Sequence, residues 1–241
     1  MGLRVVINQS NYLPWKGYFD LIHDADVFIF HDDLQYTKND WRNRNRLKTP
    51  RGPQWLTIPV GTSEHRLINE VFLPADHTWR TKHWRVIEQN YRDTPYFNLY
   101  APFCREVYLG KMRWRTLAEL NQFLLSTIAR EFLGIRTEFV DSARFRVMAK
   151  KQDRVIALLK AVGATTYISG PAAKAYLDPA KLSAEGIELV WKDYSGYPEY
   201  PQPFPPFEPA VFILDLLFGT GSTAPDFIWG WRERAVSPDK P

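Results

Sequence analysis

The segment Val5–Asp20, VVINQSNYLPWKGYFD, constrains the fold more than any other part of the chain. An apolar run at Val5–Ile7 is followed by the polar side chains of Asn8–Asn11, then by an aromatic Pro/Gly turn and a helix-like run from Tyr18. Open α/β sheets bind ligands outside the carboxyl ends of their strands, where such strand-to-helix turns lie. The segment therefore predicts a ligand site. The alternative is an ordinary turn in which Trp15 packs on the core.

Strand-like and helix-like segments alternate along most of the chain. We expect strands at Val5–Ile7, Val27–Phe30, Trp55–Val60, Thr137–Val140, Thr166–Ile168 and Ile187–Trp191. We expect helices at Tyr18–His23, Thr78–Tyr91, Asp153–Val162, Ala172–Leu177 and Ala210–Phe218, and one from Thr116, which has capping-box spacing with Glu119, to Gly134. This order predicts an α/β fold: a Rossmann-like, mostly parallel sheet flanked by helices, with a helical insert.

The segment Tyr194–Pro209 carries six prolines and five aromatic residues. Polyproline-like chain cannot join a central sheet, so the segment is either a strap wrapped on the fold or an exposed segment that binds a partner. We favour the strap, because its rings need burial and an apolar helix follows. We expect one folded unit over residues 1–241, with a candidate sub-boundary near residues 135–145.

Composition excludes several classes of site. The formal charge of +4 allows an anionic small-molecule substrate but makes nucleic acid an unfavoured partner. Cys104 is the sole cysteine, and the five histidines lack metal-ligand spacing, so we expect neither a disulfide nor a metal site. We find no secretory leader and no apolar run of membrane-spanning length, and therefore expect a cytoplasmic protein without a membrane span.

The second predicted strand ends in His31, Asp32 and Asp33. Adjacent side chains of an extended segment point to opposite faces, so the two carboxylates are not a pair that shares one proton. One of them can face a cleft, where it could act as a general base or orient a substrate amine. The alternative is two aspartates that only form a turn.

A basic run follows at Trp41–Lys48. In an extended chain its four cations lie on one face, opposite Asn43 and Asn45. Such a face suits a phosphate, a diphosphate or a carboxylate, although a solvated basic edge strand would look the same. A weaker anion site is indicated where a strand ends before a helix start. The residues concerned are Arg42, Arg44, Arg46 and Lys48 in the first site, and Ser169, Gly170 and Lys174 in the second.

Four stretches resemble the WbqC-like protein family, over essentially the whole chain: QSNYLPWKGYFD, VFIFHDDLQYTKNDWRNRNRLKTPRGPQWLTIPV, YISGPAAKAYL and Asp215–Phe218. The resemblance implies a bacterial protein of O-antigen or other surface-polysaccharide biosynthesis, from a largely uncharacterised family. For some members a glycine or amino-acyl transferase role has been suggested. This chain has Asn8-Gln9-Ser10 where the family's usual opening is His-Gln-Pro, and Asn8 cannot act as an acid or base.

A fainter likeness, to pantothenate synthetases, supports the Rossmann-like sheet. It carries over Gln35 as a candidate substrate contact. Trp15 and Tyr18 stand where those nucleotidylyltransferase-like enzymes have their two histidines, so the likeness does not support adenylation.

Three functions compete. The leading hypothesis is a transferase that delivers an acyl or amino-acyl group to a nucleotide-linked or amino sugar. Asp33 or His31 would take the proton from the attacking group, and a nucleotide or an acyl or amino-acyl donor, with an acyl carrier as a candidate partner, would be its co-substrate. The alternatives are an ATP-dependent amide-forming ligase and a non-catalytic binding module. The expected substrate-binding residues are Gln9, Asn11, Tyr12, Trp15, Asp32 and Gln35, with the seven residues of the two anion sites.

Overall fold

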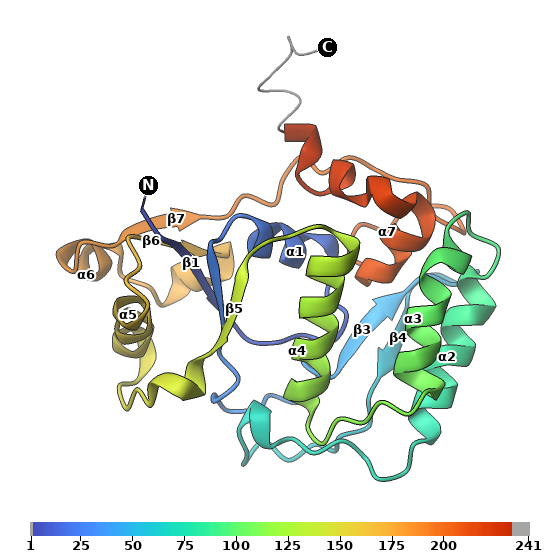
Figure 1. Ribbon diagram of the computed structural model, residues 1–241, viewed down its shortest axis with the longest axis horizontal. Helices are drawn as coiled ribbons and strands as arrows, with labels where there is room; N and C mark the ends of the chain where they lie inside the picture. The colour runs from blue at the N-terminus through green and yellow to red at the C-terminus, as the bar shows by residue number, and fades with distance from the viewer. Residues whose placement is uncertain (1, 233–241) are drawn as a thin grey trace.

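The computed structural model describes residues 2–232 (Figure 1). At its centre lies a five-stranded sheet in the order β5-β2-β1-β6-β7, in which every neighbouring pair is parallel. The predicted Rossmann-like α/β sheet is confirmed. The strands are β1 (Arg4–Asn8), β2 (Val27–Phe30), β5 (Glu138–Asp141), β6 (Thr166–Ser169) and β7 (Glu188–Trp191).

The order of the strands reverses at β1. The chain runs from β1 outward to β2 and β5, and then returns to the other side of β1 to form β6 and β7. The carboxyl ends of β1 and β6 therefore diverge into a crevice, which is the usual ligand position in open α/β sheets. The segment of the candidate sub-boundary contributes β5 to this shared sheet.

Helices cover both faces of the sheet, with α5 and α6 on one side and α1, α4 and α7 on the other (Figure 1). Side chains of β1 alternate between the two cores: Val6 packs on the α1 side, whereas Val5 and Ile7 pack on the α5 side. Burial on both faces explains the nearly continuous apolar strands. These helices are α1 (Lys16–His23), α4 (Leu117–Thr127), α5 (Lys151–Ala161), α6 (Pro179–Ala184) and α7 (Ile213–Thr220).

The helical insert consists of α2 (Thr78–Tyr91), α3 (Phe97–Leu109) and α4, which continues as a π-helical turn at Ile128–Phe132. The capping box that opens α4 is confirmed, because Glu119 N donates to Thr116 Oγ1 and Thr116 N donates to Glu119 Oε2, both at 3.2 Å. Helix α3 was not predicted. Short 3-10 turns lie at Ile68–Glu70, Ser142–Phe145, Pro171–Ala175 and Gly221–Phe227.

Two predicted elements differ from the structure. The strand expected at Trp55–Val60 is β4 (Gln54–Thr57), and it pairs antiparallel with β3 (Arg44–Leu47) in a two-stranded sheet apart from the parallel one. The helix expected at Ala172–Leu177 is only the 3-10 turn Pro171–Ala175.

The proline-rich segment is a strap, as expected. It crosses from β7 to α7 over one end of the molecule (Figure 1). Tyr197 donates from its hydroxyl to Asp20, and the Lys16 ammonium donates to the carbonyl of Pro198 at 2.9 Å. These contacts bind the strap to α1. Within residues 2–232, no helix is both long enough and apolar enough to cross a membrane.

Candidate functional site

Three adjoining cavities follow the carboxyl edge of the sheet. The central cavity, about 340 Å³, lies between the ends of β1 and β6 and is lined by Asn8, Ser169 and Gly170, among others. It shares Trp15 and Trp41 with an aromatic cavity of about 240 Å³, and it shares Asn8 with a cationic cavity of about 830 Å³. Because neighbouring cavities have walls in common, we describe them together as the cleft. The cleft lies where the strand order reverses.

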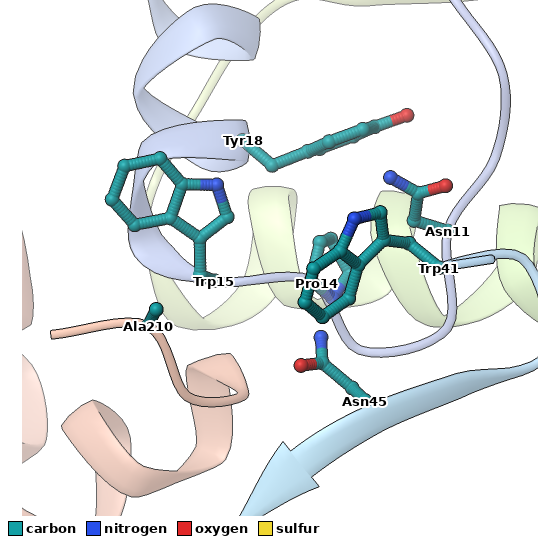
Figure 2. A pocket seen from close by; sticks show the side chains of 7 residues that line it. All are labelled: Asn11, Pro14, Trp15, Tyr18, Trp41, Asn45 and Ala210. Carbon is teal, nitrogen blue, oxygen red and sulfur yellow. The ribbon is translucent and has the colours of Figure 1, made fainter. Parts of the chain in front are cut away.

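The aromatic cavity is built from the turn after β1, the start of α1, and the hairpin formed by β3 and β4 together with Trp41 just before it (Figure 2). Trp15 is fixed from the strap side by Tyr194 and Tyr197, whose ring centroids lie 5.4 and 5.8 Å from its own. A Cβ atom added to Gly17 would lie 2.4 Å from Cζ2 of Trp15, so glycine leaves the space that the indole fills. Trp41 remains 42% exposed, which leaves an aromatic face available at the mouth of the cavity.

Arg42 holds the polar turn that lies between the cavities. Its guanidinium donates to Asn11 Oδ1 and, at 3.0 Å, to Gln9 Oε1, while Asp40 lies 3.6 Å away. The backbone carbonyl of Arg42 accepts from Asn121 at 2.8 Å. Arg42 therefore connects the hairpin to the cleft and fixes which atoms of the two amide side chains face outward.

The cationic cavity lies at the start of α5. Its positively charged lining residues are Lys150, Lys151, Arg154 and Lys181, and its one carboxylate is that of Asp153, which lies 4.0 Å from Lys181. The structure thus places a cluster of cations at the ligand edge of the sheet, but the cluster comes from a segment that the sequence did not single out.

Arg154 joins α5 to the end of β2. Its Nε–H donates to His31 Nε2 at 3.0 Å, and its two terminal nitrogens donate to Asp33 Oδ2 and to the Val147 carbonyl. Ser142 Oγ donates to the other oxygen of Asp33 at 2.6 Å. Burial lowers the pKa of His31 to about 4, so its imidazole is neutral at neutral pH.

Asp32 points to the opposite side from Asp33, as the alternation of an extended segment predicts. Its carboxylate is buried and accepts from the backbone N–H of Ser10 at 2.8 Å and from Gln122 Nε2 at 2.9 Å. Burial raises its pKa. Asp32 therefore stabilises the turn after β1 through its bond to the Ser10 N–H.

The WbqC-like protein family matches residues 9–227. The chain belongs to the WbqC-like protein family. A protein of Mycobacterium tuberculosis (strain ATCC 25618 / H37Rv), named "Uncharacterized protein Rv1507c", is 43% identical over 227 residues, which cover 93% of this chain and 97% of that protein. No solved structure matches the chain. The family match begins at Gln9, in the polar turn, and therefore includes the whole cleft apart from the residues of β1.

In this WbqC-like chain, the basic run forms β3 and its flanks, with the predicted alternation: Asn43 and Asn45 are buried, whereas Arg44 and Arg46 are partly exposed. Each of the four cations has a partner within the protein. Arg44 stacks 4.1 Å from the Trp55 ring, and Arg46 donates to the Ala210 carbonyl at 3.1 Å.

Lys48 is buried against the strap. Its ammonium donates to Gln202 Oε1 at 3.0 Å and to the carbonyl of Pro206 at 2.5 Å. Of the four cations in the basic run, Arg42 and Arg46 have guanidinium groups that bond to residues lining the cleft, Arg42 to Gln9 and Asn11 and Arg46 to Ala210. A ligand contact by any of the four stays a prediction.

The remaining predicted residues divide between the cleft and other places. Gln9, Asn11, Trp15, His31, Ser169 and Gly170 line the cleft. Tyr12 is fully buried, and its hydroxyl bonds to Tyr108 and, at 2.9 Å, to His83. Gln35 lines a separate depression beside His65. Lys174 is exposed and lies 5.5 Å from the Trp191 ring.

A group of metal-type ligands also lies in the described chain, at Asp20, His23 and Asp24. The protein supplies its own cations there, because Lys192 lies 2.9 Å from Asp20 and 2.5 Å from Asp24, and Arg232 binds Asp20 through two nitrogens at 2.6 and 2.7 Å. These contacts account for the carboxylates as anchors of Lys192, just before the strap, and of Arg232, beyond α7.

Proposed function

We propose that the cleft transfers an acyl or amino-acyl group to a nucleotide-linked or amino sugar, in bacterial surface-polysaccharide (O-antigen) biosynthesis. The observation that supports the proposal is that the two ends of the cleft are lined by different kinds of side chain. Indole and amide side chains line one end, cations line the other, and the central cavity joins them. A sugar ring suits the first environment, and phosphate groups suit the second.

At the sugar end, Trp41 offers an exposed ring and Asn11 an amide. Because Asn11 Oδ1 accepts from Arg42, its Nδ2–H₂ group is the part left to donate to a sugar hydroxyl. Gln9 is held in the same way through Oε1. Two preoriented amides beside an aromatic face would fix one orientation of a sugar and expose its amine or hydroxyl for attack on the acyl donor.

The proton acceptor stays a prediction, with Asp33 and His31 as the candidates. In the structure, Arg154 donates to both of them. A direct base role for either side chain would therefore require that Arg154 first release it. His31 lines the cleft, which makes it the better placed of the two.

The proposal is tested by incubating the protein with amino-sugar nucleotides and acyl or amino-acyl donors and measuring both binding and transfer. We expect Trp41→Ala to weaken nucleotide-sugar binding about tenfold, the effect of losing one stacking contact. Phe72→Ala is a matched control, because Phe72 is a 53% exposed ring that packs under Arg115 rather than on the cleft. Absence of binding by the wild type, or full retention in Trp41→Ala, would contradict the proposal.

A further inference from the structure

The cationic cavity holds more positive charge than its protein neighbours neutralise. Lys181 and Asp153 face each other at 4.0 Å, and Arg154 is paired with Asp33. The ammonium groups of Lys150 and Lys151 have no hydrogen bond or ion pair to any residue in the range 2–232. Both lysine side chains are exposed, so their ammonium groups are free to contact an anion that enters the cavity.

His31 provides a second, independent indication of a ligand. Its side chain lines the cavity, and the residue is only 7% exposed. Because Arg154 Nε–H donates to Nε2, that nitrogen is the acceptor, and the proton of the neutral ring must lie on Nδ1. No described residue accepts a hydrogen bond from Nδ1. The protein does not enclose this Nδ1–H, which opens into the cavity, and an anion bound there would accept from it.

The start of α5 adds further donors. Lys150 occupies the N-cap position, and its side chain makes no capping bond, so the first amides of the helix lack a side-chain acceptor. Lys151 has a φ of +52°, a left-handed conformation that is unfavourable for lysine. The Arg154 bond to the Val147 carbonyl braces this turn from the other side. Strain of this kind is tolerated where it positions functional groups.

We infer that the cationic cavity binds a diphosphate group, with Lys150, Lys151 and the Nδ1–H of His31 as donors to its oxygens and Arg154 as the positioning residue. A cavity of about 830 Å³ is large enough for a nucleoside diphosphate. The diphosphate site stands on its own contacts. The orientation of a complete substrate, with the sugar extending through the central cavity toward Trp41, rests on the proposed function.

The test is isothermal titration calorimetry of the full chain with inorganic pyrophosphate and with uridine diphosphate. The variant Lys150→Gln/Lys151→Asn removes two charges, and asparagine tolerates the left-handed conformation at position 151. The matched control, Lys82→Gln/Lys111→Asn, removes two charges from exposed lysines outside the cleft. For each probe, we expect the dissociation constants of the wild type and of the control to agree within twofold. The dissociation constant of the cleft variant should be at least tenfold higher.

A second variant, His31→Leu, removes the Nδ1–H donor that faces the cavity. We expect it to weaken pyrophosphate binding as well, with thermal melting to verify that the fold is kept. If His31 acted only as a proton acceptor, His31→Leu would abolish transfer and leave pyrophosphate affinity unchanged, which overturns its assignment here. Absence of pyrophosphate and uridine diphosphate binding in the wild type, or affinity within twofold in the double lysine variant, overturns the site itself.

The two proposals fail separately. Acyl transfer to an amino-sugar nucleotide with an unchanged KM in Lys150→Gln/Lys151→Asn would refute the diphosphate site and leave the proposed function intact. Lysine-dependent diphosphate binding without transfer to any amino sugar would support the site and count against the proposed function.

Discussion

Asp215 is a buried carboxylate whose charge should make a measurable contribution to how stability changes with pH. It is fully buried in the first turn of α7. Its carboxylate accepts from Tyr91 Oη and Tyr200 Oη, both at 2.8 Å, and from Gln202 Nε2 at 2.6 Å. Lys48 lies beyond Gln202 and bonds to its amide oxygen. Through these contacts, one carboxylate connects α2, α7, the hairpin and the strap.

Burial raises the pKa of Asp215 from 3.8 to about 6, and the hydrogen bonds and Lys48 offset this effect only in part. Because the pKa in the folded state lies above the pKa in the unfolded state, folding is favoured by protonation. The contribution is complete below pH 3.8 and is lost as pH rises through 6. At 1.36 kcal/mol per pH unit, the whole difference is about 3 kcal/mol, of which roughly 2 kcal/mol falls between pH 4 and pH 7.

The assay is urea unfolding of the wild type and of Asp215→Asn at pH 4, 5, 6 and 7. The free energy of unfolding of the wild type, relative to the variant, should fall by about 2 kcal/mol over this range. His31 and His83, whose pKa values burial lowers to about 4, titrate in the opposite direction in both proteins and cancel in the difference. Asp93→Asn, at a side chain that is 92% exposed, is the control. A flat difference, or one that rises with pH, would refute the reasoning.

Two further predictions concern stability. Gly17→Ala should cost about 1–2 kcal/mol in urea unfolding, although alanine normally favours a helix, because its Cβ atom would lie 2.4 Å from the Trp15 ring; stabilisation instead would show that the indole moves freely. Thr116→Ala should cost about 1 kcal/mol, since it removes the side chain that accepts from the Glu119 N–H at 3.2 Å. Thr116→Ser keeps the hydroxyl and should recover most of that loss. If it does not, the loss of stability does not come from the capping hydrogen bond.

The sequence predicted the parts of the fold that depend on nearby residues. The alternation of apolar and polar segments around β1, α1 and β2 was sufficient for the first βαβ unit. The bounds of α2 and the capping box of α4 also followed from local spacing. By contrast, α3 carries Pro102 in its interior, a residue that argues against a helix, and tertiary packing overrides that preference.

The sequence indicated residues of the cleft at three strand ends, including His31 after β2 and Ser169 and Gly170 after β6. Gln9, Asn11 and Trp15 follow β1 directly and line the cleft, and their contact with a ligand stays a prediction. The cationic cavity was missed because its lysines precede a helix more than a hundred residues later. Only the strand order, with β6 returning beside β1, brings α5 to the end of the first strand. Local sequence carries no signal for that order, since a parallel strand can join either edge.

The two clusters of cations show why a basic run in a sequence does not by itself locate an anion site. The run at Arg42–Lys48 is the denser cluster, yet each of its cations is engaged by other parts of the protein, including Gln202 and Glu208 of the strap, and the Nε–H groups of its three arginines are enclosed. Lys150 and Lys151 form a shorter run whose ammonium groups have no acceptor within residues 2–232, and they lie beside His31, whose Nδ1–H opens into the same cavity. Binding capacity depends on donors that the fold leaves both unsatisfied and open to a cavity, and those become visible only when the rest of the chain is in place.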